Sequence, residues 1–515
     1  MYKKFILISF ILINSFSFSK SIEYVNEKII VKIEKNYSFD DINNQLMQIS
    51  FNLDKKLSNH LNIWLVSYDL SIYLNIDDAI QKLEFFPFII YAQKDHKITE
   101  RLIPNDTEFE NMWHLHNTGQ NAGSIDADID APEAWDILTG NSDDDIVIGI
   151  VDSGFDLTHQ DLVDNIWVNL NEIPGNGIDD DENGYIDDVN GWDAYENDGD
   201  IPLTSHGTKV LGMIGAKGNN NLDVVGVNWD ISLMPIAGSS SSTSTVISAY
   251  SYALDNKLLW NDTDGVLGAN VVAINSSFGI NYANCNDGSY PVWNDMYNTL
   301  GEAGILSIAA TMNINANVDE FGDVPTGCSS DYIISVTNTD RNDSKFISAA
   351  YGLTSIDLGA PGTSVCSTRP NNLISCSLTG TSYSTPIVSG TVGMVHAAAS
   401  NILKGEYINN PSETSIIIKN IILNTVDYLT SMDTITVSGG RLNLYNAVYA
   451  ASLYDGLCSI PGDFNSDTNI NIQDVILIVN CILSYCTIDE NSCMDLNQDI
   501  GIDIFDIVLL VSMII

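Results

Sequence analysis

The most informative stretch of this 515-residue chain is Gly380-Thr381-Ser382-Tyr383-Ser384-Thr385-Pro386. It is a short glycine-led turn, and the small and apolar residues 387–399 that follow it are typical of a buried helix. Ser382 is then expected at the helix N-terminus, where backbone N–H groups and the helix macrodipole favour negative charge near its hydroxyl. A serine placed there is either a plain helix cap or, where a base can reach it, a nucleophile.

Two further stretches favour the nucleophile. The apolar run Val147-Ile148-Gly149-Ile150-Val151 suits a strand buried on both faces, and Asp152 follows it directly. Open α/β sheets place ligands and catalytic groups at this carboxyl end of a strand. The stretch Ser205-His206-Gly207-Thr208 opens a run of small residues, and its histidine supplies a base.

In this chain order and with these flanks, Asp152, His206 and Ser382 resemble the triad of the subtilisin-like serine proteases. The resemblance covers roughly residues 105–450. It implies an α/β fold, a mostly parallel sheet flanked by helices, and a serine endopeptidase that works through an acyl-enzyme intermediate on protein or peptide substrates. Ser382 would attack, His206 would act as base and then acid, and Asp152 would orient the imidazole.

Two alternatives stay open beside this interpretation. One is a catalytically silent subtilisin-fold scaffold whose C-terminal tail mediates attachment to a partner. The other is a dedicated processing protease of one partner, which only substrate profiling separates from a general endopeptidase.

Charge is distributed unevenly along the chain. The whole sequence has 21 Lys and Arg against 67 Asp and Glu, a net charge of −46, and 45% of its residues are hydrophobic. Residues 1–101 hold 12 basic and 12 acidic side chains, so the remaining residues carry the entire negative charge. Phosphate binding needs clusters of Lys and Arg, which excludes nucleic acid as a partner.

The N-terminal part predicts export of a precursor. Residues 1–19 have Lys3 and Lys4, a short apolar run and small residues suited to cleavage, as in a secretory signal peptide. No later run reaches the roughly 18 apolar residues of a membrane span, so we expect a secreted protein, extracellular, at the cell surface or in a periplasm. Residues 20–104 alternate strand and helix patterns and resemble the family's inhibitory α+β propeptide. Such a propeptide is an intramolecular partner of the catalytic domain, which we expect at residues 105–455. The alternative is an ordinary N-terminal domain that stays attached.

The family resemblance also assigns residues around the scissile bond. The end of the run 271–279 is similar to the strand that pairs with the substrate backbone, which makes Ser277, Phe278 and Gly279 the substrate-binding candidates. The stretch 304–313 aligns with the segment that ends in the oxyanion-hole asparagine, here Asn313, although Met312 stands where the family usually has glycine. Asn315 or Asn317 are the alternative donors. Asp323 is expected near the primary specificity pocket, where it would favour a basic residue before the cleaved bond.

An acidic insertion between Asp152 and His206 predicts calcium. Oxygen-bearing side chains occupy positions 1, 3, 5 and 9 of a calcium-loop pattern, with Gly184 at position 6 for the sharp turn; these ligands are Asp179, Asp181, Asn183 and Asp187. Position 12 is Asn190, a poor substitute for a bidentate carboxylate. A solvated acidic loop is the alternative.

The tail, residues 456–515, contains an internal repeat. Two copies, 32 residues apart, each give Asp, Asn and Asp at positions 1, 3 and 5, an oxygen at 9 and Asp at 12, followed by an apolar helix. The predicted Ca²⁺ ligands are Asp463, Asn465, Asp467, Asn471 and Asp474, then Asp495, Asn497, Asp499, Asp503 and Asp506. The tail resembles a small helical EF-hand or dockerin-like module. Positions 10 and 11 differ from the polar pairs of familiar dockerins, so a cohesin-like partner and a purely structural role both remain open.

The eight cysteines favour disulfides in an exported protein. Cys366 and Cys376 bracket a short stretch typical of a hairpin, so we expect them to pair. By elimination within residues 105–455, we then expect Cys285 to pair with Cys328.

Overall fold

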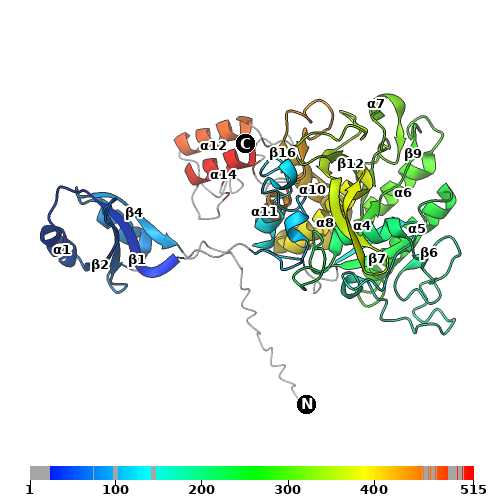
Figure 1. Ribbon diagram of the computed structural model, residues 1–515, viewed down its shortest axis with the longest axis horizontal. Coiled ribbons are helices and arrows are strands. Elements are labelled where there is room, and N and C mark those ends of the chain that lie inside the picture. Colours follow the sequence, from blue (N-terminus) through cyan, green and yellow to red (C-terminus); the bar gives the residue numbers. More distant parts are fainter. Residues whose placement is uncertain are drawn as a thin grey trace, which may run out of the picture. The chain divides into compact units, whose positions relative to one another are not determined.

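The computed structural model describes residues 24–73, 75–96, 102–140 and 146–454, and in the tail residues 456, 462, 464, 470, 472–484, 494, 496, 502 and 504–514. The chain divides into two compact units, residues 1–100 and 101–515 (Figure 1). The expected signal peptide, residues 1–19, lies outside the described residues. Within the described residues, every helix is too short or too polar to cross a membrane.

The N-terminal unit is a small α+β fold, as expected. Its described elements are β1 Tyr24–Ile33, α1 Phe39–Met47, β2 Phe51–Ser58, β3 Ile63–Tyr68, α2 Ile76–Glu84 and β4 Ile89–His96. The strands form an antiparallel sheet in the order β2-β3-β1-β4. Both helices begin with a side-chain cap and acidic residues in the first turn, which stabilise a helix N-terminus; Ser38 caps α1 and Asn75 caps α2.

The second unit is built on a large sheet. Within the described residues this sheet has nine strands in the order β16-β17-β13-β12-β10-β8-β5-β7-β6, parallel except for the edge pair β16–β17. The strands are β5 Ile146–Asp152, β6 Trp192–Asp193, β7 Ser232–Ala237, β8 Asn270–Ser276, β10 Leu306–Ala310, β12 Ile333–Thr339, β13 Leu358–Pro361, β16 Asp427–Tyr428 and β17 Gly440–Arg441. This arrangement confirms the predicted fold class.

Within residues 102–454 the described helices are α3 Ala131–Trp135, α4 Ser205–Gly215, α5 Thr243–Asp262, α6 Pro291–Glu302, α7 Val318–Phe321, α8 Thr381–Ala398, α9 Asn401–Asn409, α10 Pro411–Asn424 and α11 Leu444–Leu453, with short 3₁₀ turns at Phe109–Asn111, Gln120–Ala122 and Val163–Asn165 (Figure 1). Of these helices, α4, α5, α6 and α8 pack directly on strands of the large sheet. Nearly all of α8 is buried, and it packs against α4, α11 and the central strands β8, β10 and β12. The glycine-led stretch that begins α8 is therefore held at the centre of the unit.

Two short β-ribbons and two disulfides lie within the described residues 146–454 of this unit. The ribbons pair β9 Ile280–Asn281 with β11 Asp323–Val324, and β14 Thr363–Arg369 with β15 Leu373–Thr379. Disulfides join Cys285 to Cys328 and Cys366 to Cys376, the pairings expected from the sequence. The second of them closes the β14–β15 hairpin.

In the tail, α12 Ile472–Ser484 and α14 Ile504–Ile514 pack together through an apolar core that includes Ile478 and Leu510. This core accounts for the apolar faces that follow the two repeats.

Candidate active site

Asp152 and His206 lie in direct contact. Asp152 ends the buried strand β5, and its side chain is almost fully buried, whereas His206 is the second residue of α4 and its side chain is 40% exposed. The two carboxylate oxygens lie 3.0 and 2.9 Å from His206 Nδ1. Because a carboxylate only accepts, Nδ1 carries the proton, and Nε2 is left as the basic nitrogen.

The charge of Asp152 decides the basicity of His206. Burial alone lowers the pKa of His206, but the hydrogen bond and the negative charge of Asp152 outweigh burial and raise that pKa above its ordinary value. Asp152 is itself oriented by the Ser153 backbone N–H, which donates to Oδ1 at 2.7 Å. The pair therefore consists of a fixed carboxylate and a strengthened base.

Ser382 is the second residue of α8, and its neighbour Tyr383 lies close to the histidine, with the two ring centroids 6.1 Å apart. The Ser382 hydroxyl donates to the carbonyl oxygen of Ser277 at 3.3 Å. Among the described residues, no hydrogen bond joins Ser382 to His206, so the hydroxyl has to leave Ser277 before it can pass its proton to the base. Catalytic hydrogen bonds often tighten only when substrate is bound.

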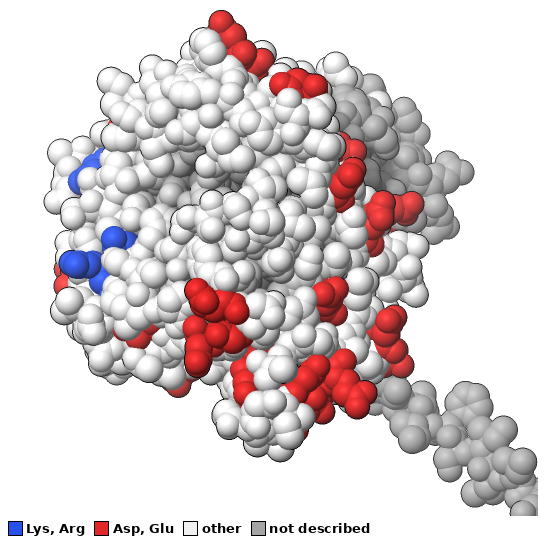
Figure 2. Space-filling view, turned by 90° about the vertical axis from the view of Figure 1, so that its right-hand side faces the viewer, with Lys and Arg blue, Asp and Glu red and all other residues white. Residues whose placement is uncertain are grey.

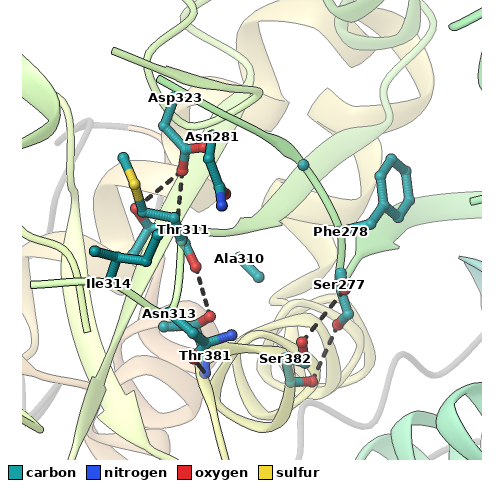
Figure 3. Close-up of a pocket in the computed structure, with 12 residues that line it drawn as sticks. Ser277, Phe278, Asn281, Ala310, Thr311, Asn313, Ile314, Asp323, Thr381 and Ser382 are labelled. Carbon is teal, nitrogen blue, oxygen red and sulfur yellow. Dashed lines mark hydrogen bonds between the residues drawn. The ribbon is translucent and has the colours of Figure 1, made fainter. Parts of the chain in front are cut away.

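Pro386 explains a second contact between the same elements. In a regular helix the N–H of residue 386 would donate to the Ser382 carbonyl, but proline has no N–H. The Ser277 hydroxyl donates to that carbonyl instead, at 3.0 Å. The residue that directly follows strand β8 is thus tied to the first turn of α8 (Figure 3).

A cavity of about 240 Å³ opens beside Ser382. It is lined by all three predicted substrate-binding residues and by residues that follow β10, together with the start of α8; the lining residues are Ser277, Phe278, Gly279, Asn281, Ala310, Thr311, Met312, Asn313, Ile314, Asp323, Thr381 and Ser382. Figure 3 shows Ser382 and Asn313 toward one end of this cavity and Asp323 toward the other.

Asn313 lines the cavity beside Ser382, and the orientation of its side-chain amide is fixed. Its Oδ1 accepts the backbone N–H of Thr381 at 3.0 Å, so the amide nitrogen is the group left to donate. The two alternative donors are engaged elsewhere: Asn315 Oδ1 accepts from Lys345 Nζ, and Asn317 caps α7. Neither of them lines the cavity.

Met312 fits the turn without a glycine. Its φ is not among the positive φ angles of the described residues, so the backbone there does not require glycine. Its side chain is buried with Ala316, Val318 and Ile356. Its backbone N–H donates to Asp323 Oδ2 at 3.0 Å. The departure from the family pattern therefore leaves Asn313 at the cavity.

The acidic insertion gathers some of its predicted ligands. Oxygen atoms of Asp179, Asp181 and Glu172 lie within 4.8 Å of one another. Asn183 is close by, and its backbone N–H donates to both aspartates. Asp187 is turned elsewhere, because its carboxylate accepts the backbone N–H groups of residues 176 and 177.

Glu172 is the member of this cluster that the motif does not contain. One of its carboxylate oxygens accepts the backbone N–H groups of Asp180 and Asp181, and the other accepts that of Asp187. The sequence signal that was available is a glutamate seven residues before the acidic loop, but the calcium-loop pattern starts at Asp179 and does not include it.

In the tail, Asp474 and Asp506 are the predicted ligands that the structure describes. Both are buried and stand in the first turn of α12 and α14, and Asp474 accepts the backbone N–H of Phe464 at 2.8 Å. The other predicted tail ligands lie outside the described residues; these are Asp463, Asn465, Asp467, Asn471, Asp495, Asn497, Asp499 and Asp503.

Comparison with known proteins agrees with this geometry. A model of the subtilase family matches residues 143–445. Subtilisin-like protease 1 of Plasmodium berghei (strain Anka) is 30% identical over 342 residues, which cover 61% of this chain and 51% of that protein. Thermitase of Thermoactinomyces vulgaris is 28% identical over 326 residues, 62% of this chain and 93% of that protein. An extracellular protease of Xanthomonas campestris pv. campestris is 27% identical over 366 residues, 67% of this chain and 57% of that protein. The chain thus spans about half the length of the Plasmodium relative.

Proposed function

The chain belongs to the subtilase family, and on that premise we propose that it is a secreted, calcium-stabilised serine endopeptidase. The observation that carries the proposal is the Asp152–His206 pair at 2.9 Å, with the serine of a glycine-led helix start beside it. Its substrates are proteins or peptides whose backbone can pair with an extended strand.

The proposed reaction proceeds by acyl transfer. His206 Nε2 takes the proton of the Ser382 hydroxyl as Oγ attacks the scissile carbonyl, and the imidazolium returns this proton to the leaving amine. Asp152 stabilises the imidazolium that forms between these steps. In the second half of the reaction, His206 takes a proton from water as the water attacks the acyl-enzyme carbonyl. The imidazolium then gives this proton to Ser382 Oγ, and the acid product leaves.

The negative oxygen of the tetrahedral intermediate needs donors in place before it forms. We assign this role to the Asn313 side-chain amide and the backbone N–H of Ser382. The hydrogen bond from Thr381 to Asn313 Oδ1 supports the assignment, because it fixes which end of the amide faces the cavity.

The substrate backbone is proposed to lie along residues 277–279. Gly279 lacks a side chain where space is short: a Cβ there would stand 2.6 Å from the Val324 carbonyl oxygen. Recognition by strand addition uses main-chain hydrogen bonds, and the cavity then supplies preference for a side chain.

Synthesis as a precursor is the next part of the proposal. Residues 1–19 would direct export, and the α+β unit of residues 20–104 would fold separately and act as intramolecular inhibitor until it is removed. Its separate hydrophobic core supports an independently folding segment. Its balanced charge contrasts with the acidic remainder of the chain.

Calcium is proposed to bind the acidic insertion. Glu172, Asp179 and Asp181 supply carboxylate oxygens, the ligand type that Ca²⁺ prefers, at mutual distances that one cation can bridge. Bound there, the ion would neutralise carboxylates that otherwise repel one another and would hold the insertion in place.

The tail is proposed as a second calcium module of the dockerin-like type. Buried aspartates in the first turn of both α12 and α14, at the position 12 of each repeat, support this assignment. Whether a cohesin-like protein binds it is a separate question that a binding assay with the full chain addresses.

Labelling by a fluorophosphonate tests the catalytic proposal. We expect covalent labelling of the secreted wild-type protein and none of Ser382→Ala, with loss of residues 20–104 only where the serine is present. A folded, mature wild-type protein that stays unlabelled in calcium would contradict the proposal and favour the silent scaffold.

A further inference from the structure

Asp323 is a buried carboxylate in the wall of the cavity beside Ser382. It is 1% exposed and stands in the short strand β11, opposite Asn281 of β9. Its placement follows from the β9–β11 ribbon, which brings Asn281 and Asp323 to the same end of the cavity (Figure 3).

The two oxygens of Asp323 have different environments. Oδ2 accepts the hydroxyl of Thr326 at 2.7 Å and that of Thr311 at 3.1 Å. The Met312 N–H also donates to Oδ2, at 3.0 Å. Oδ1 is buried without a hydrogen-bond partner within the described residues. Because an unpaired buried polar atom is costly, a donor brought by a ligand would stabilise it.

Gly279 places bare backbone next to this unpaired oxygen. A Cβ on Gly279 would stand 3.6 Å from Oδ1, so the absence of a side chain keeps the approach from the substrate strand short. The same glycine is proposed to pair with the substrate backbone. A side chain that enters the cavity from that backbone therefore passes toward Asp323.

Within the described residues, the cavity lining contains no Lys, Arg or His to neutralise the carboxylate. Burial raises the pKa of Asp323 to about 6, which leaves the group ionised at the mildly alkaline pH where a neutral His206 is available. A buried charge without a counter-charge favours a ligand that supplies one. The face drawn in Figure 2 has more acidic than basic side chains, in keeping with the net charge of −46, and a negative net charge attracts cationic substrates.

We propose that Asp323 makes this cavity selective for arginine or lysine as the residue before the scissile bond, with the cationic head group paired to Oδ1. The inference rests on the proposed peptidase function and narrows its substrate class. The alternative is that Asp323 only stabilises the turn at Met312 through Oδ2.

Peptide substrates that differ only in the residue before the cleaved bond provide the test. We expect wild-type kcat/KM to be about 10²-fold higher for arginine and lysine than for leucine and glutamine. Asp323→Asn should remove most of this difference by lowering the values for the basic substrates. Asp323→Glu keeps the charge and should retain a preference for basic residues. Asp295→Asn, an exposed position on α6, removes the same charge outside the cavity and should leave the preference unchanged.

The outcomes separate the two proposals. Wild-type protein that is labelled by fluorophosphonate but cleaves neutral and basic substrates equally would overturn the preference and leave the peptidase function standing. Persistence of the preference in labelled Asp323→Asn would also overturn the role of Asp323. Absence of labelling in folded wild type would overturn the peptidase function and the inference with it.

Discussion

Ser277 and Ser382 donate their hydroxyls to each other's carbonyl oxygens, at 3.0 and 3.3 Å. Pro386 makes the first of these bonds necessary, because it deprives the Ser382 carbonyl of its helical partner. Ser277→Ala should therefore lower the free energy of unfolding by about 1–2 kcal/mol. It should also lower kcat, since the first turn of α8 loses its tie to the substrate strand. Urea unfolding and peptide hydrolysis measure the two effects, and Ser277→Ala with wild-type stability would contradict the account.

Asn313→Ala should reduce kcat by about 10²–10³ with little change in KM, because the amide is proposed to act only on the oxyanion. Asn315→Ala is the matched control, since Asn315 bonds Lys345 and does not line the cavity. Equal losses in the two variants would show that Asn313 is not the oxyanion donor. Steady-state kinetics on one peptide substrate suffices.

The pH profile should report the Asp152–His206 pair. Activity needs neutral His206, so kcat/KM should rise with pH through the pKa of His206, which lies above the ordinary value of about 6.5. Asp152→Asn removes the charge that favours the imidazolium, so that pKa should fall and the acid limb should move to lower pH. The maximal rate should fall by about 10⁴-fold, because the tautomer is no longer fixed. If the acid limb of Asp152→Asn stays at the pH of the wild-type limb, the pH profile does not report the titration of His206.

Gly207 lies next to His206 at a point of close contact. A Cβ at Gly207 would stand 2.3 Å from the Gly154 carbonyl oxygen and 2.7 Å from the Phe155 ring. Gly207→Ala should cost about 1–3 kcal/mol of stability and lower activity by displacing the start of α4. In α9, Gly405→Ala meets nothing within 4 Å and should be neutral or stabilising by about 0.5–1 kcal/mol. Thermal unfolding of both variants tests the contrast.

Glu172→Gln should weaken the proposed calcium site in the insertion. A ligand present at 100 times its dissociation constant stabilises a protein by about 2.7 kcal/mol. We expect calcium to raise the Tm of wild type and to raise it less in Glu172→Gln, with a remaining shift from the tail. Glu182→Gln, an exposed residue of the same loop outside the carboxylate cluster, serves as the control. Equal calcium-induced increases of Tm in all three proteins would show that calcium does not bind to this loop.

The fold could be predicted where burial leaves a strong pattern. The apolar run 147–151 became β5, one residue longer at each end, and the run of small residues after Ser382 became the buried helix α8. Strand β2 was not predicted, because it is the exposed edge of its sheet and its polar sequence lacks alternation.

Local spacing predicted the site less evenly. The motifs for Asp152, His206 and Ser382 stand at element ends that the sheet brings together. In the insertion, the spacing selected Asp187, whose carboxylate bonds the backbone of a neighbouring turn. It missed Glu172, which joins the cluster through loop closure. A motif with fixed spacing cannot identify a residue that reaches the cluster only because the loop folds back.

The proposed role of Asp323 has a consequence for self-cleavage of the proposed protease. With the proposed preference, each exposed Lys or Arg is a potential point of self-digestion. The N-terminal unit exposes Lys35, Lys55, Lys56 and Lys82, whereas residues 102–515 contain nine basic residues and the tail from 456 contains none.

All nine lie within the described residues, and among them Arg369 is the one whose side chain is exposed. The residue after it is Pro370, whose nitrogen has no hydrogen, and the Cys366–Cys376 disulfide closes the hairpin around this bond. If residues 20–104 are removed as proposed, the remaining chain presents few bonds that fit the proposed preference to other copies of itself, while the N-terminal unit remains open to cleavage. On these two proposals, the scarcity of basic residues in residues 102–515 would protect that part of the chain from autolysis.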